Sequence, residues 1–141
     1  MFDKEIMEEG MIIHHRIGWK ELLHYNKNPP IISFPKGLTV YNKYKNHIIK
    51  IKDIYSYLIN YLFVNDDFYV IADADFPYYV SEYITHKILW FNPKYYKLIN
   101  LDYNYVCKLL HMKFKNFIIF ENIQNNKSVK NIKHFHFFIS L

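Results

Sequence analysis

The segment spanning residues 122–141 constrains the fold of this chain most strongly. It reads as a polar loop followed by a strand, in which alternate side chains share one face. His134 and His136 are therefore expected on one face, and Phe135 and Phe137 on the other. The loop before the strand contributes three polar residues, Asn122, Lys127 and Ser128. Two imidazoles beside such a loop suit the binding of a phosphate.

Length and charge narrow the class of protein. A chain of 141 residues with 51% hydrophobic residues is long enough for one domain with a real core. The formal net charge is +5, yet Arg16 is the only arginine. Arginine is the usual residue for bidentate recognition of bases, so a sequence-specific nucleic-acid reader is not indicated. A mildly positive field still attracts phosphorylated small molecules.

The cysteine count and the hydrophobic pattern predict a cytoplasmic, intracellular protein. Cys107 is the single cysteine, so no internal disulfide can form. No apolar run reaches the roughly 18 residues of a membrane span. The first nine residues are charged and lack a signal-peptide pattern. We therefore expect no association with a membrane.

Periodicity and turn signals predict an order of helices and strands. A short helix is expected over 18–25, ended by Pro29 and Pro30, and a longer one carries an apolar stripe over 51–62 that should pack on a sheet. Asp102 is suited to cap a helix that runs to about residue 113. Segments rich in β-formers predict strands over 68–73, 85–91, 116–121 and 134–139.

This order predicts a single α+β domain over 1–141. Strands with short connections form antiparallel pairs, and helices mainly on one face of such a sheet leave the opposite face free for a ligand. Residues 1–64 are expected to form a helical N-terminal extension packed on the domain.

Several motifs resemble the histidine-triad (HIT) superfamily. Its members carry a turn with Asp and Pro, a strand with His and then Pro, an Asn, a Ser, and a closing H-φ-H-φ-H run. The matching pieces here are Asp73-Ala-Asp75-Phe-Pro77, His86 to Pro93, Asn122, Ser128-Val129 and His134-Phe-His136-Phe-Phe138. The order is similar over 68–139, and is closest to an uncharacterised branch with D-F-P-Y, H-x-x-x-W and S-V…H-φ-H motifs.

The resemblance implies a HIT-like fold and a nucleotide hydrolase or nucleotidyltransferase. In the superfamily the middle His attacks an α-phosphorus. If Phe138 replaces the third His, His136 is the matching nucleophile and His134 its neighbour. If the first His is the lost one, His134 is the nucleophile. Members are typically dimers, which implies a homodimer unless the N-terminal helices cover that edge.

The candidate substrate-binding residues are Ser128, Asn122, Lys127, His86, Asp73 and Asp75. Ser128 and Lys127 suit the equatorial phosphate oxygens, and an Asp at the turn suits ribose hydroxyls. Three of these residues also have a structural interpretation: His86 as a satisfied core histidine, and Asp73 and Asp75 as turn caps. Tyr78, Tyr79 and Trp90 either stack on a base or belong to the core.

Two other interpretations stay open. His86, His134 and His136 could supply three ligands to Zn²⁺, but no carboxylate has a matching spacing, and neither a metal nor a cofactor is expected. A degenerate HIT-like fold could instead serve as a protein-interaction module, with the aromatic N-terminal third as its contact surface. An enzyme needs both imidazoles accessible in a concavity, whereas a degenerate module would have them covered.

Overall fold

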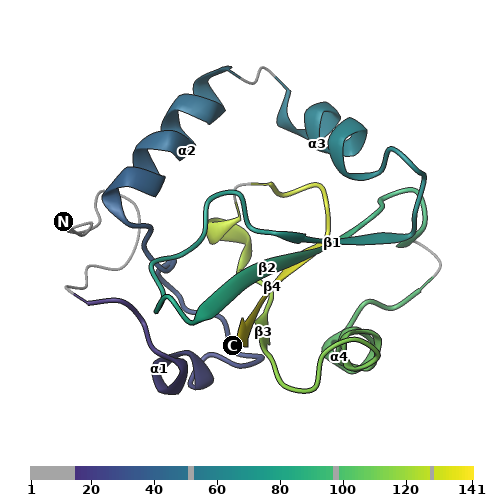
Figure 1. The fold of residues 1–141 in the computed structure, drawn as a ribbon. Coiled ribbons are helices and arrows are strands. Elements are labelled where there is room, and N and C mark those ends of the chain that lie inside the picture. Colours follow the sequence, from purple (N-terminus) through teal and green to yellow (C-terminus); the bar gives the residue numbers. More distant parts are fainter. Residues whose placement is uncertain (1–14, 51–52, 97–98, 128) are drawn as a thin grey trace.

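The computed structural model describes residues 15–50, 53–96, 99–127 and 129–141, and these form an α+β fold around one sheet (Figure 1). The elements follow in the order α1 (Trp19–Leu23), α2 (Leu38–Lys50), α3 (Ile54–Leu62), β1 (Tyr69–Asp73), β2 (Ile84–Phe91), α4 (Tyr103–His111), β3 (Ile118–Phe120), the 3-10 helix η2 (Gln124–Asn126) and β4 (His134–Ser140). Among the described residues, no helix combines the length and the apolar character that crossing a bilayer requires.

The four strands pair antiparallel in the order β1-β2-β4-β3. All four were predicted at nearly these positions from their β-formers and their turns. The register sets His136 opposite Ile88 of β2 on one side and Phe120 of β3 on the other. The strand that carries the histidines is therefore an inner strand, and its polar groups have neighbours on both flanks.

Helices cover both faces of the sheet, which corrects the prediction that they lie mainly on one (Figure 1). Helix α4 packs Val106 and Leu110 against Phe135 and Phe137 on the face away from the histidines. Helix α3 packs Leu58 and its apolar neighbours against the opposite face, beside Trp90. The expected open face is closed because α2, α3 and the segment before them contribute enough apolar surface to bury it.

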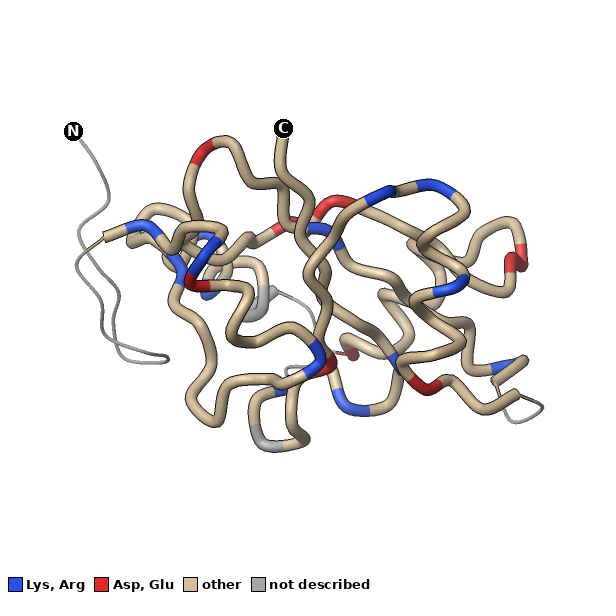
Figure 2. The backbone as a smooth tube through the Cα atoms, turned by 90° about the horizontal axis from the view of Figure 1, so that it is seen from below, with Lys and Arg blue, Asp and Glu red and all other residues tan. Residues whose placement is uncertain are grey.

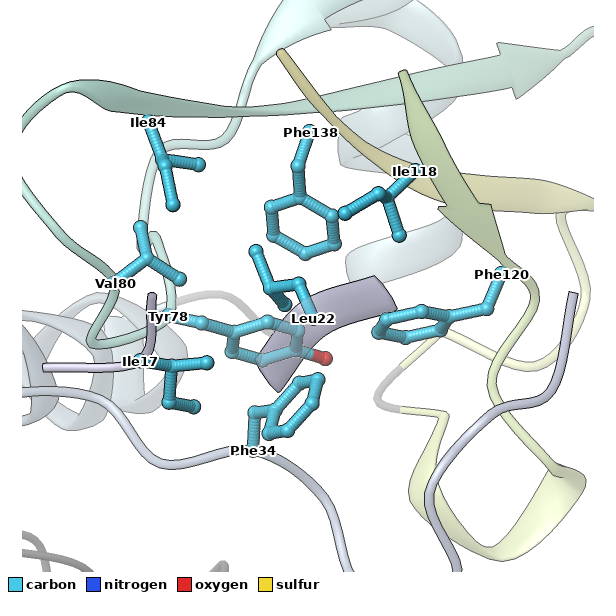
Figure 3. Packing of buried hydrophobic residues seen from close by; sticks show 9 residues of the cluster. All are labelled: Ile17, Leu22, Phe34, Tyr78, Val80, Ile84, Ile118, Phe120 and Phe138. Carbon is cyan, nitrogen blue, oxygen red and sulfur yellow. The ribbon is translucent and has the colours of Figure 1, made fainter. Parts of the chain in front are cut away.

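The segment that includes α1 fills the remainder of the histidine face. Phe138 of β4 contacts apolar side chains from β3, from the β1–β2 connection and from the N-terminal part of the chain (Figure 3). The cluster of buried residues to which Phe138 belongs also includes Ile17, Leu22, Phe34, Tyr78, Val80, Ile84, Ile118 and Phe120. Burial of one Phe or Leu side chain stabilises a fold by about 1.5–3 kcal/mol, so this packing holds the N-terminal segment firmly on the sheet.

The amphipathic helix predicted over 51–62 corresponds to α3, and a further helix, α2, precedes it over Leu38–Lys50. Asp53 begins α3: its side chain accepts a hydrogen bond from the Ser56 amide at 3.2 Å, as an N-cap does. Asp102 caps α4 in the same way through the Tyr105 amide at 2.9 Å, and this cap was predicted.

Candidate functional site

A cavity of about 150 Å³ lies on the histidine face of the sheet. Its floor is polar and comes from β2, from β4 and from the second residue after β3: His86, His134, His136 and Asn122. Its walls come from α2, α3, the loop after β1 and the loop before β4. The sequence analysis placed these four polar residues together, and the structure brings them to one cavity.

His86 and His136 form one hydrogen-bonded pair in this floor. The Tyr78 backbone N–H donates to His86 Nδ1 at 3.1 Å, so that nitrogen carries a lone pair. Burial, assisted by the charge of Lys36, lowers the pKa of His86 to about 3, and the ring is neutral at pH 7. Its one proton is therefore on Nε2, which donates to His136 Nδ1 at 2.8 Å.

The second nitrogen of His136 fixes the orientation of Asn122. Because His136 Nδ1 accepts, the neutral ring carries its proton on Nε2, which lies 3.2 Å from the Asn122 carboxamide. If Asn122 Nδ2 faced His136 Nε2, two hydrogen-bond donors would point at each other. Asn122 Oδ1 would then be buried without a partner among the described residues. With the amide turned over, Oδ1 accepts from His136 and from the Tyr78 hydroxyl, 3.0 Å away.

The turned amide leaves the Asn122 NH₂ group as the unpaired polar group. Asn122 is only 6% exposed, and a buried donor without a partner costs about 1–3 kcal/mol. The atom at that position is buried, so the donor has no partner among the described residues. The two rings and the amide thus form a fixed relay of neutral groups, in which His136 has no nitrogen lone pair free.

The ring nitrogens of His134 are hydrogen-bonded differently from those of His136. Its Nδ1 lies 2.8 Å from the Ile132 carbonyl oxygen, so Nδ1 carries the proton and donates. Nε2 then holds a lone pair and makes no hydrogen bond with any described residue. The ring stacks on Trp90, with centroids 4.5 Å apart, and this contact fixes its plane. Of the two imidazoles, His134 is the one with a ring nitrogen that makes no hydrogen bond with a described residue.

The charge around the floor is positive. Burial is the main cause that lowers the pKa values of His134 and His136, so both rings are neutral at pH 7. The charges of Lys36 and Lys127 lower the pKa of His136 further. Lys36 Nζ lies 5.3 Å from the centre of the Tyr78 ring, at the wall of the cavity. Over the described chain as a whole, basic and acidic positions are interspersed (Figure 2).

Of the other predicted substrate-binding residues, some line the cavity and some do not. Asp75 lines the cavity. Asp73 does not, because it lies on the opposite face of β1 and forms an ion pair with Lys87 at 2.6 Å. Lys127 is also outside the lining, and its ammonium pairs with Glu121 at 2.7 Å. Ser128 lies outside the described residues.

The aromatic residues of the sequence prediction divide into three environments. Tyr78 stacks on His86, with centroids 4.6 Å apart, and so belongs to the relay. Trp90 lines the cavity beside His134. Tyr79 is buried elsewhere, with the Arg16 guanidinium 4.6 Å from the centre of its ring.

Sequence reasoning missed several lining residues. These are Ser33, Lys36, Tyr44, His47, Tyr57 and Phe76. They come from the N-terminal third of the chain and from the loop after β1. The resemblance did not cover that third, and only its aromatic content could have suggested a role. Among the described residues, no group of three His, Cys, Asp or Glu side chains is placed to hold a metal ion.

The fold and the sequence were compared with known proteins. The fold is similar to that of "Crystal Structure of HTC1", with 16% sequence identity over 89% of this chain and 85% of that chain, and a TM-score of 0.59. At this identity the likeness concerns the fold alone. A comparison with curated proteins gives no match. The family described as "Protein of unknown function (DUF3605)" matches residues 2–140, and the chain therefore belongs to this family.

Proposed function

We propose that the cavity binds a phosphate ester of the nucleotide class and that His134 Nε2 attacks its phosphorus. The observation that carries the proposal is the Nδ1–H to Ile132 carbonyl bond of 2.8 Å, which leaves the Nε2 lone pair of a neutral, buried ring free. A neutral imidazole is the form of histidine that acts as a nucleophile. The protein is then a nucleotide hydrolase or nucleotidyltransferase.

The two imidazoles have different roles in this proposal. His136, first expected as the nucleophile, uses both nitrogens in the relay and holds the floor in place. In HIT terms Ile132 then occupies the first position of the H-φ-H-φ-H run, His134 the middle and His136 the last. This is the register in which the first His is lost, and it gives the attacking role to the middle residue, as the resemblance implies.

The reaction would proceed in two displacements. The Nε2 lone pair forms a bond to phosphorus while the phosphorus–oxygen bond to the leaving group breaks, and the leaving oxygen takes up a proton. A water molecule, or an acceptor hydroxyl in a transferase, then attacks phosphorus. The nitrogen–phosphorus bond breaks and its electron pair returns to His134, while the attacking oxygen loses its proton. Splitting one displacement into two lowers each barrier.

The surroundings of His134 suit a phosphoryl group. The charge of Lys36, which lines the cavity and contributes to the lowered pKa of His136, favours an anion in the cavity. Donors that are already fixed at the place where charge develops stabilise a transition state without reorganisation.

The test uses the p-nitrophenyl ester of thymidine 5′-phosphate, because release of nitrophenolate is read by absorbance. We expect turnover by the natural chain and a loss on the order of 10³-fold or more with His134→Ala. His24→Ala, at an exposed histidine after α1, is the matched control and should keep full activity. Mass spectrometry after rapid quenching should find a nucleotidyl group on His134. Turnover that survives His134→Ala would refute the role of this residue.

A second candidate function is a protein-interaction module with no catalysis. The observation in its favour is that His134 and His136 are only 5% and 8% exposed, beneath the face that α2, α3 and the N-terminal segment cover. It predicts that a panel of mono- and dinucleotides gives neither binding heat nor turnover. Binding heat that His134→Ala abolishes would decide for the phosphate-ester function.

A further inference from the structure

We propose that four rings in the wall of the cavity form the binding site for the base of the nucleotide. We call Tyr44, His47, Tyr57 and Phe76 the wall rings; they come from α2, from α3 and from the loop after β1. The inference rests on the proposed function and deepens it, because it assigns a base-recognition site to helices outside the resemblance. It also replaces the base site first expected at Tyr78, Tyr79 and Trp90.

The wall rings contact one another across three separate segments. His47 lies 5.6 Å from Tyr57 and 5.2 Å from Phe76, and Tyr44 lies 5.5 Å from Phe76, all between ring centres. The His47–Tyr57 and Tyr44–Phe76 pairs meet at 71° and 75°. These contacts join side chains from α2, α3 and the loop after β1 into one aromatic surface in the wall of the cavity.

Size and charge favour a flat ring attached to an anion. An engineered apolar cavity of 150 Å³ is known to hold benzene, and the volume here is about the same. A flat ring of about the size of benzene therefore fits. Lys36 lies between the two parts of the site, with Nζ 4.8 Å from the Tyr44 ring of the wall and 5.3 Å from Tyr78 of the floor.

These features commit the site to one kind of ligand. Its base contacts the wall rings, its phosphate lies toward Lys36 and the floor, and His134 Nε2 faces the phosphate. Stacking on an aromatic side chain tolerates any base, since every base has a π face. We therefore expect selection for a nucleotide over a sugar phosphate, with little preference among bases.

The experiment compares two probes by calorimetry: adenosine 5′-monophosphate and ribose 5-phosphate, which lacks the base. We expect the nucleotide to bind at least about tenfold more tightly, and Tyr57→Leu to reduce nucleotide affinity by about tenfold. Affinity for ribose 5-phosphate should not change. Phe76→Leu should give the same pattern and serves as a second variant from another segment.

The matched control is Tyr61→Leu. Tyr61 is on the same helix as Tyr57, is 57% exposed and stacks on its outer side at 5.9 Å, but it does not line the cavity. This variant should bind both probes as the natural chain does.

Two results would overturn the inference. One is equal affinity for the two probes, or no binding of either; the other is unchanged nucleotide affinity in both Tyr57→Leu and Phe76→Leu. Equal affinity together with turnover that depends on His134 would remove the base site and leave the proposed function standing. Nucleotide affinity that depends on Tyr57, with turnover that is absent or unaffected by His134→Ala, would leave the base site standing and remove the proposed function.

Discussion

Acid should destabilise this protein through His86, and the size of the effect follows from its burial. The unfolded chain binds a proton at His86 below pH 6.5, whereas the folded chain does not until the pH approaches about 3. Because the unfolded state binds more protons in this window, the free energy of unfolding falls as the pH falls. The slope for one histidine is about 1.4 kcal/mol per pH unit, so lowering the pH from 7 to 5 costs about 2 kcal/mol at His86.

The perturbation that isolates this contribution is His86→Gln. Glutamine does not titrate, and its amide can still donate toward His136 Nδ1 in place of the imidazole. The assay is urea unfolding followed by circular dichroism at pH 7 and at pH 5, with linear extrapolation to water. The loss of stability between the two pH values should be about 2 kcal/mol smaller in the variant than in the natural chain.

The control is His24→Gln, at an exposed histidine, which should leave the pH dependence unchanged. His134 and His136 also have lowered pKa values, so each contributes a further loss of stability on acidification. Both residues are present in all three proteins that are compared. If His86→Gln and the natural chain lose the same stability on acidification, His86 is not held neutral in the folded state. The assignment of protons to the ring nitrogens of His86 and His136 would then be wrong.

Two further predictions concern catalysis and the core. Burial lowers the pKa of His134, and only its neutral form attacks phosphorus, so kcat/KM should be constant from pH 8 down to about 6.5 and fall at lower pH; a fall that begins above pH 7 would contradict this. Leu110→Ala should cost about 2–5 kcal/mol in urea unfolding, because Leu110 is fully buried between α4 and the sheet. Met112→Ala, at a residue that is 79% exposed, should stay within about 0.5 kcal/mol.

The elements of the sheet and the cap of α4 could be predicted because local signals determine them. Alternation over 134–139 identified the strand that carries the histidines, and Asp102 stands where a cap is needed. Both signals depend on residues within a few positions of one another. The positions of the four polar floor residues in one cavity followed from the same alternation and from the order of the motifs.

The covering of the histidine face could not be predicted in this way. Polar residues at alternate positions of a strand usually mark a solvated face, yet His134 and His136 are buried. Three of their four ring nitrogens have partners inside the protein, which are a backbone carbonyl, Asn122 and His86. Those partners come from other parts of the fold, and a strand pattern contains no information about them.

The roles of the two imidazoles were hidden for the same reason. A chain of hydrogen bonds determines which nitrogen of His136 is the acceptor. It begins at the Tyr78 amide, fifty-eight positions away in sequence. Asp73 illustrates a simpler limit: the face on which it lies depends on the register of β1 against β2, through its pairing with Lys87. The turn motif alone does not reveal that register.

The place of β4 between β2 and β3 also has a consequence for how the chain acquires its structure. During synthesis β1 and β2 can pair early, since they are neighbours in sequence, but β3 has no described strand to pair with until β4 is made. The ladder between β2 and β4 joins residues about fifty positions apart. Contacts of such long range slow folding, so the cavity and its reactive histidine should form in the last step rather than grow gradually with the chain.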